Sequence, residues 1–180
     1  MKQIRIHGRG GQGVVTAAEL IAIAAFNDNK EAQAFPHFGV ERTGAPIEAF
    51  ARIDEKPIRT REHVYAPDVL IVQDPTLLST VNVTHGHDSN TLAIINTTKD
   101  KNELNIDMPL NNVHTIDATK IALDVIGKNI MNTVILGAFA KATGLVSLNS
   151  LKKAVEQKFE KKSKSIINKN IKAIEKAYNG

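Results

Sequence analysis

A glycine-rich run between a strand and a helix constrains this chain more than any other feature. Gln3–His7 has β character and Val14–Leu20 is helix-forming; between them stand Gly8, Arg9, Gly10, Gly11, Gln12 and Gly13. Glycines at such a junction let the backbone approach a phosphate at the helix N-terminus, where unpaired amides and the helix dipole face an anion. The spacing of the first, third and last glycine also fits the dinucleotide pattern G-x-G-x-x-G. The same turn can be a tight joint without a ligand, so the anion must be identified from the rest of the chain.

The length indicates a single domain over residues 1–180, large enough for a sizeable core. No apolar run approaches membrane-spanning length, and the chain starts directly on a strand, so we expect no membrane association and a cytoplasmic location. The absence of cysteine excludes disulfides, zinc–cysteine sites and thiolate-bound iron–sulfur clusters within this chain. Any redox centre must therefore belong to a partner or be a non-covalent cofactor.

The net charge of +4 is concentrated at the end of the chain, where Ser150–Gly180 holds nine lysines and three glutamates. Apolar residues recur there at helical spacing in two sets: Leu148, Leu151, Val155 and Phe159, then Ile167, Ile171, Ile174 and Tyr178. The lysines are therefore the solvent faces of two amphipathic helices. No aromatic residues alternate with them as a nucleic-acid surface would require, so we expect no nucleic-acid partner.

The periodicity predicts alternating strands and helices. Buried strands are expected at Gln3–His7, Val69–Val72, Thr91–Ile95 and Val113–Ile116, and helices at Val14–Phe26, Ala118–Ile126, Asn132–Ala142 and from Ser147. Ile47–Ile53 alternates as a half-buried strand, and Pro57–Arg59 returns after a short turn, which requires antiparallel pairing. Gln33–Pro46 is expected to be irregular. The expected fold is a three-layer α/β/α arrangement with a mostly parallel, mixed sheet and two C-terminal amphipathic helices.

Three polar features are expected at the carboxyl edge of this sheet: the glycine run, Asp74-Pro75, and Asn96-Thr97-Thr98. Asp74 and Asn96 could equally cap turns or helices. A nicotinamide-binding fold needs an acid after the second strand, where the sequence has Pro36-His37-Phe38, and this disfavours a dinucleotide. His85-Gly86-His87-Asp88 has too few ligands for a metal and suits a surface turn. With no G-x-S-x-G motif and no cysteine nucleophile, we expect neither a metal site nor a catalytic residue here.

The segment Phe35–Pro46 is the second unusual feature, with two aromatics, two glycines, two prolines and an adjacent Glu41-Arg42 pair. A long structured loop is often functional. Arg42 could pair with a phosphate. The apolar content of the segment equally suits a subunit interface.

These two motifs together resemble a known family. Gly8 to Ala18 is similar to the opening signature of the gamma subunits of 2-oxoacid:ferredoxin oxidoreductases, and Ala34–Pro46 is similar to their second signature. Ile53–Arg59 and Asp68–Asp74 extend the resemblance in order, so that it covers essentially the whole chain. Among these gamma subunits, those of the pyruvate-oxidising type are the most similar.

The resemblance implies a reaction shared among several subunits. A 2-oxoacid is decarboxylated on thiamine diphosphate, electrons pass through iron–sulfur clusters to ferredoxin, and the acyl group passes to coenzyme A. The thiamine and clusters lie on partner alpha, beta and delta subunits, and the gamma subunit is associated with coenzyme A binding and assembly. The resemblance implies coenzyme A contacts at Gly8–Gly13 and at Glu41, Arg42, Thr43 and Gly44.

Several alternatives remain open at this point. The oxoacid could be 2-oxoglutarate, a branched-chain oxoacid or indolepyruvate instead of pyruvate. The chain could be a stand-alone dinucleotide-dependent oxidoreductase, or a purely structural subunit whose glycine run serves packing. A homodimer of the isolated chain is also expected if Phe35 and Phe38 are exposed.

Overall fold

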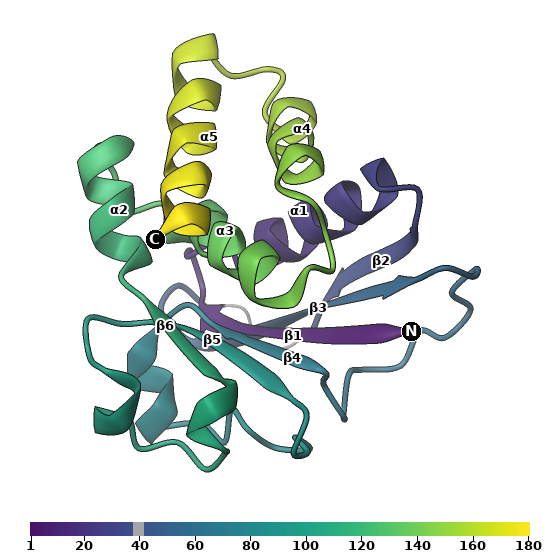
Figure 1. The fold of residues 1–180 in the computed structure, drawn as a ribbon, viewed down its shortest axis with the longest axis vertical. Helices are drawn as coiled ribbons and strands as arrows, with labels where there is room; N and C mark the ends of the chain where they lie inside the picture. Colours follow the sequence, from purple (N-terminus) through teal and green to yellow (C-terminus); the bar gives the residue numbers. More distant parts are fainter. Residues whose placement is uncertain (38–41) are drawn as a thin grey trace.

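The computed structural model describes residues 1–37 and 42–180 and has an α/β fold built on one six-stranded sheet (Figure 1). The strands are β1 (Lys2–Arg9), β2 (Glu31–Pro36), β3 (Pro46–Asp54), β4 (Val69–Val72), β5 (Leu92–Asn96) and β6 (Val113–Ile116). Their order is β2-β3-β1-β4-β5-β6, in which β1, β4, β5 and β6 run parallel and β3 runs antiparallel to both β1 and β2. The prediction of a mixed, mostly parallel sheet is confirmed.

The two faces of the sheet are covered by different kinds of helix. The α-helices are α1 (Val14–Asn27), α2 (Ala118–Val125), α3 (Met131–Thr143), α4 (Leu148–Lys158) and α5 (Lys164–Asn179), and all lie on one side of the sheet (Figure 1). The opposite side carries the short 3-10 helices η1 (Pro75–Ser79), η2 (Lys101–Glu103) and η3 (Leu110–Asn112) with their loops. The third expected layer is thus made of 3-10 helices and loops, and the two C-terminal helices are present as predicted.

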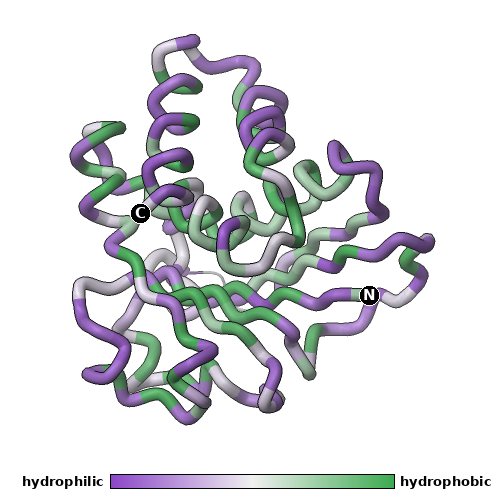
Figure 2. Tube along the Cα trace, viewed as in Figure 1, coloured by the Kyte–Doolittle hydropathy of each residue, from purple (hydrophilic) through white to green (hydrophobic). Residues whose placement is uncertain are grey.

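Two apolar clusters hold these layers together. The larger packs α1 to α5 against Ile4, Ile6 and Ile71, and the smaller packs Leu77 of η1 against Leu70 and its neighbours on the other face. Figure 2 shows that hydrophobic residues dominate the central strands, whereas α4 and α5 carry long hydrophilic stretches. The continuous apolar runs in β4 and β5 follow from this burial on both faces.

The face of β1, β3 and β2 turned away from α1 is polar and aromatic, and the chain between β3 and β4 covers it. Arg52 is 1% exposed; its guanidinium donates to Gln3, Gln33 and the Glu62 carbonyl and lies 5.1 Å from the centroid of the Phe35 ring. Residues 55–68, all of them described, form no strand. The predicted antiparallel return at Pro57–Arg59 is therefore wrong, because β3 already has β1 and β2 as partners.

The expectation that Gln33–Pro46 is irregular is also wrong at both ends. Residues up to Pro36 form β2 with alternating faces, and Pro46 opens β3. The Phe35 ring lies 5.2 Å from the ring of Phe50 and is only half-exposed. Phe38 lies outside the described residues.

Helix ends follow the capping residues of the sequence. Asp117 accepts from the Lys120 amide at 2.8 Å and starts α2, and Ser147 accepts from the Ser150 amide and starts α4. Gly144 ends α3 with φ of 61°.

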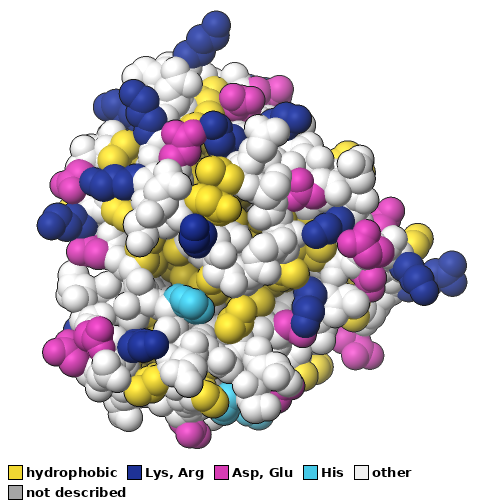
Figure 3. Space-filling view, viewed as in Figure 1, with side chains coloured by type: hydrophobic (Ala, Val, Ile, Leu, Met, Phe, Trp, Pro, Cys, Tyr) yellow, Lys and Arg dark blue, Asp and Glu magenta, His cyan; other side chains and the backbone are white. Residues whose placement is uncertain are grey.

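Figure 3 shows the basic side chains over α4 and α5 spread among acidic ones. Among the helices that the structure describes, none is long and apolar enough to cross a membrane.

Candidate functional site

The glycine run lies at a crevice on the carboxyl edge of the parallel strands. From β1 the chain passes into α1 on the α-helical face, and from the neighbouring β4 it passes through Asp74 into η1 on the other face. Ligands of open α/β sheets bind where successive connections part in this way. The fold therefore places Gly8–Gly13 at the edge where the sequence predicted a site.

The two signature segments of the sequence contact each other here. The Gly10 amide donates to the Ala45 carbonyl at 2.9 Å, and the Gly44 amide donates to the Gly10 carbonyl at 3.0 Å. Gly10 also forms a β-bridge with Thr43. A Cβ built on Gly10 would overlap the carbonyl oxygen of Arg42, which is backbone and cannot rotate away. Glycine is required here because two backbones approach closely.

The amides that begin α1 lack a side-chain cap. Gly13 occupies the N-cap position with φ of 70°, and no side chain of the described residues accepts a hydrogen bond from the first amides of the helix. The Asn132 amide of α3 donates to the Gly13 carbonyl at 3.2 Å, and a Cβ on Gly13 would collide with that amide group. The helix start thus fits a phosphate: it presents free amides, a positive dipole end and no acidic residue in its first turn.

Arg9, Gln12 and Asp74 tie the glycine run to β4 and η1. The Arg9 guanidinium lies 3.2 Å from the Asp74 carboxylate and donates to the Gly44 carbonyl and to the Thr76 hydroxyl, at 3.1 and 2.7 Å. Gln12 accepts from the Arg9 amide and donates to Asp74, both at 2.8 Å. Partial burial alone would raise the pKa of Asp74, but the hydrogen bonds from Thr76 and Gln12 and the Arg9 charge lower it. Asp74 therefore stays ionised and fixes the shape of the loop.

The remaining predicted residues divide into three groups. Arg42, Thr43 and Gly44 are exposed beside the glycine run, and Glu41 lies outside the described residues. Asn96 ends β5 but is turned inward: its amide donates to the Gln73 carbonyl at 2.8 Å and to the Thr119 hydroxyl at 2.9 Å. It joins β4 to α2, as the capping alternative proposed. The sequence therefore placed these residues correctly at the carboxyl edge of the sheet. It did not decide which of them face a ligand and which hold the fold together.

Sequence reasoning missed two residues of this edge. Asn132, in the first turn of α3, positions Gly13 from more than a hundred residues away. Gln73 is fully buried under Gly8, and its side-chain oxygen and nitrogen have no hydrogen-bond partner among the described residues. The one feature of the sequence that could have indicated Gln73 is its position, as a polar residue directly after the apolar run of β4.

A buried ionic network lies immediately before the glycine run. His7 is 2% exposed; its Nε2 accepts from the Arg5 guanidinium at 3.1 Å, and its Nδ1 lies 3.4 Å from the Glu48 carboxylate. Burial lowers the pKa of His7 to about 4, reinforced by Arg5 and opposed by Glu48 and a backbone contact with Val83. Since Nε2 accepts a hydrogen bond, the ring is neutral in the fold.

Protonation of His7 is expected to destabilise the fold in mildly acidic solution. The folded-state pKa lies below the ordinary 6.5, so the unfolded chain binds more protons, and stability falls as pH drops from about 6.5 toward 4. The loss reaches roughly 3 kcal/mol. Denaturant unfolding between pH 7 and 4 measures it: His7→Gln should flatten the profile, and His114→Gln, on an exposed residue, should not. Equal slopes for His7→Gln and wild type would contradict this assignment.

The histidine pair near β5 lies in a turn held by its own hydrogen bonds. The His87 Nδ1 lies 2.8 Å from the Thr84 carbonyl, and the Asp88 carboxylate accepts from the Asn90 amide at 2.8 Å. Within residues 1–37 and 42–180, no group of three or more histidines and acids is arranged to hold a metal ion.

The order of the strands separates this site from a nicotinamide-binding one. In a nicotinamide-binding fold the second strand lies beside the first and carries an acid at its end. Here β3 lies antiparallel between β1 and β2, and β2 ends at Pro36 followed by His37. Because β3 separates β2 from β1, a residue at the end of β2 does not lie beside the glycine run as the acid of a nicotinamide-binding fold does.

The sequence matches the pyruvate ferredoxin/flavodoxin oxidoreductase family over residues 3–180. The chain belongs to this family. It is 56% identical over 155 residues to pyruvate synthase subunit PorC of Methanosarcina barkeri. This alignment covers 86% of this chain and 85% of that protein. It is 51% identical to the pyruvate/ketoisovalerate oxidoreductases common subunit gamma of Thermococcus kodakarensis, covering 99% and 96%.

A solved structure of the same family has the same fold. The crystal structure of pyruvate oxidoreductase subunit PORC from Thermotoga maritima superposes with a TM-score of 0.86 at 38% identity, covering 99% of this chain and 95% of that one. The family resemblance drawn from the two glycine-bearing signatures is confirmed. Gly8–Gly13 of the first signature and Thr43–Ala45 of the second lie at the crevice described above.

Proposed function

We propose that this chain is the gamma subunit of a complex that oxidatively decarboxylates pyruvate to acetyl-coenzyme A and reduces ferredoxin. The names of the relatives support pyruvate as the oxoacid, and the shared pyruvate/ketoisovalerate subunit keeps a branched-chain oxoacid as the second candidate. The iron–sulfur clusters belong to partner subunits, because this chain has no cysteine to bind them. Thiamine diphosphate is assigned to the alpha, beta and delta subunits from the family resemblance. The chain contributes coenzyme A binding and assembly and supplies no catalytic residue.

The uncapped start of α1 beside the joined signatures carries this proposal. The amides of Gly11 and Gly13–Thr16, which have no hydrogen-bond partner among the described residues, and the positive end of the helix suit the phosphates of coenzyme A. The Gln12 amide is engaged, because it donates to the Arg9 carbonyl. Gly8–Gly13 form this site, in which Arg9 and Gln12 hold the loop in shape, and Arg42–Gly44 lie at its outer side. Glu41, outside the described residues, is proposed as a further coenzyme A contact. Coenzyme A supplies the thiol that accepts the acyl group, and this chain holds and orients its phosphates.

The outer side of this site is also the proposed contact with a partner subunit. Arg42 and Thr43 are exposed and stand next to the loop, so a partner seated there covers the coenzyme A path. Exposed arginines are frequent anchors of interfaces. Self-association of the isolated chain, expected from exposure of Phe35 and Phe38, stays a prediction; Phe35 is partly buried against Phe50, and Phe38 lies outside the described residues.

Reversal of the charge at Arg42 tests this assignment. Arg42→Glu is expected to raise the KM for coenzyme A at least about tenfold, to weaken assembly of the complex, or both, because it places an anion beside a phosphate and at the interface. The fold should survive, since Arg42 is exposed. Analytical ultracentrifugation measures assembly, steady-state kinetics measures the KM, and thermal unfolding checks the fold.

Lys153→Glu is the matched control, because Lys153 is an exposed cation on α4, far along the chain from both signatures. It should change neither assembly nor the KM for coenzyme A. The proposal fails if Arg42→Glu assembles normally and keeps the wild-type KM.

A further inference from the structure

The strand β2 is an edge of the sheet, and its outer side has no strand partner in the part of the chain that the structure describes (Figure 1). The His37 amide, just after β2, donates to the Glu48 carbonyl of β3 at 3.0 Å. Amides along an antiparallel strand alternate in direction, so those of Ala32 and Ala34 point away from β3. Pro36 has no N–H and offers only its carbonyl on that side. This edge is therefore able to pair with one more strand.

The helix beside this edge carries an apolar flank. Asn27 of α1 donates to the Gln157 side chain of α4 at 3.2 Å, so α4 covers the flank on which Asn27 lies. Val15, Ala22 and Phe26 recur at helical spacing on the flank away from it. The Phe26 side chain is 73% exposed, and Val15 and Ala22 are only partly buried. Because α1 packs directly on β2, this flank and the free edge of β2 form one surface, which we call the edge surface.

The backbone of the edge surface is complementary to a second copy of itself. Two β2 strands can pair antiparallel around a two-fold axis with Ala34 opposite Ala34 of the second copy. The two Ala34 residues then exchange both of their hydrogen bonds, and each Ala32 amide donates to the Pro36 carbonyl of the other copy. This register uses both outward amides of β2 and asks for no N–H from Pro36.

The side chains of the edge surface match in the same register. Glu31 and His37, both exposed at opposite ends of β2, come to lie opposite each other across the two copies and can form a charged pair. The chain returns through α1 in the direction opposite to β2, so Phe26 lies near the start of β2 and Val15 near its end. Each Phe26 therefore meets the flank near Val15 of the second copy. An apolar centre with charged residues at its rim is the usual anatomy of a protein interface.

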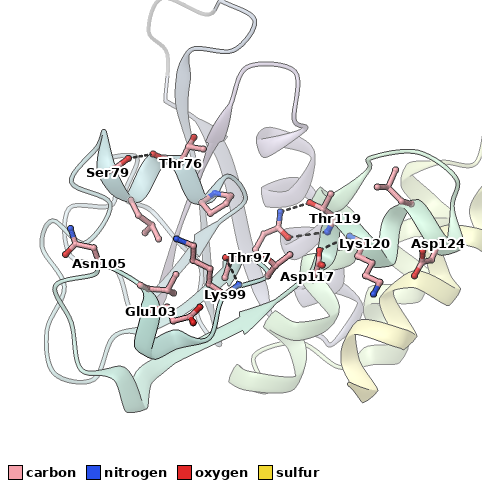
Figure 4. A pocket seen from close by; sticks show the side chains of 16 residues that line it. Thr76, Ser79, Thr97, Lys99, Glu103, Asn105, Asp117, Thr119, Lys120 and Asp124 are labelled. Carbon is pink, nitrogen blue, oxygen red and sulfur yellow. Dashed lines mark hydrogen bonds between the residues drawn. The ribbon is translucent and has the colours of Figure 1, made fainter.

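The cavity between η1, η2 and α2, of about 810 Å³, is a contrasting surface (Figure 4). Lysines and carboxylates line it together: Lys99, Lys120, Glu103, Asp117 and Asp124. This mixture favours neither an anion nor a cation. The same cavity includes Leu123 of α2, which is 51% exposed. Leu123 therefore provides an exposed apolar residue on another helix as a control for Phe26.

We propose that the edge surface is a symmetric interface between two copies of this chain, in which the two β2 strands join their sheets into one. It lies apart from Arg42 and Thr43, the proposed contact with a partner subunit. The inference does not depend on the ligand of the glycine run. In the assembled enzyme, this interface links two complexes through this subunit.

The first test measures the oligomeric state of the full chain by analytical ultracentrifugation over a concentration series. Wild type should be a reversible dimer. Phe26→Gln should raise the Kd of the dimer at least about a hundredfold, because each dimer loses the buried ring twice. Leu123→Gln should keep the wild-type Kd. Glutamine suits a helix, and both residues are exposed, so thermal unfolding should show that both variants keep the fold.

The second test checks the register by cross-linking. The chain has no cysteine, so Ala34→Cys introduces a single thiol. Opposite residues of a hydrogen-bonded antiparallel pair have Cα atoms about 5.5 Å apart, which a disulfide can span. Mild oxidation should link two Ala34→Cys chains at least about tenfold faster than two Leu123→Cys chains, which meet only by collision.

Three results would overturn the inference. The first is a wild-type chain that stays monomeric throughout the concentration series. The second is a dimer whose Kd is the same in Phe26→Gln as in wild type, because the copies then meet elsewhere. The third is cross-linking of Ala34→Cys no faster than that of Leu123→Cys. If wild type is monomeric and Phe26→Gln instead weakens assembly with the partner subunits, the edge surface binds a partner and not a second copy.

Discussion

Gly10→Ala should raise the KM for coenzyme A in the assembled complex by about tenfold or more and leave the KM for the oxoacid unchanged. The added Cβ overlaps the Arg42 carbonyl, so the two signature segments must separate. Separation breaks the hydrogen bonds that join Gly10 to Gly44 and Ala45. Each such bond contributes about 1 kcal/mol, and a tenfold change in affinity corresponds to about 1.4 kcal/mol. Steady-state kinetics with each substrate varied in turn gives both constants.

Gly127→Ala is the control for a general loss of stability. Gly127 follows α2 with φ of 84°, so alanine is strained there, but its added Cβ has nothing within 4 Å. This variant should unfold at a lower temperature and keep the wild-type KM for coenzyme A. A correctly assembled Gly10→Ala complex with an unchanged KM would remove the glycine run from the coenzyme A site.

The sequence predicted the elements whose signals are local. The apolar run of β4, the capping residues Asp117 and Ser147 and the stop at Gly144 all act within a few residues of their position. Periodicity and capping are local properties of the chain, so these boundaries were accessible without a structure.

The errors lie where distant residues decide the structure. The six-residue strand β2 lies at the edge of the sheet, and its only strand partner there is β3. It is therefore a strand because of pairing with β3 and not because of a local signal. The alternation of β3 was correctly read, but nothing local showed that residues 55–68 cover its second face and bury Arg52. Tertiary contacts of this kind override local propensity.

The place of the glycine run at the carboxyl edge of the sheet was predicted, its contacts with the rest of the chain were not, and ligand binding there stays a prediction. Glycine spacing and the carboxyl edge of the sheet located Gly8–Gly13, but the contact with Thr43–Ala45 joins residues more than thirty positions apart. The sequence did not indicate that Arg9 contacts Asp74, Gly44 and Thr76, which join it to distant parts of the chain. A contact of Arg9 with coenzyme A stays a prediction.

Reconstitution of the complex with and without this chain tests the central claim, that it is a subunit that supports coenzyme A use and does not catalyse the reaction itself. The purified chain should show no oxoacid-dependent reduction of ferredoxin or of a dye, because it has no cysteine to bind a cluster and, in the proposed function, supplies no catalytic residue. The alpha, beta and delta subunits alone should form little acyl-coenzyme A, and addition of this chain should restore its formation. Turnover by the chain alone, or full acyl-coenzyme A formation in its absence, would contradict the account.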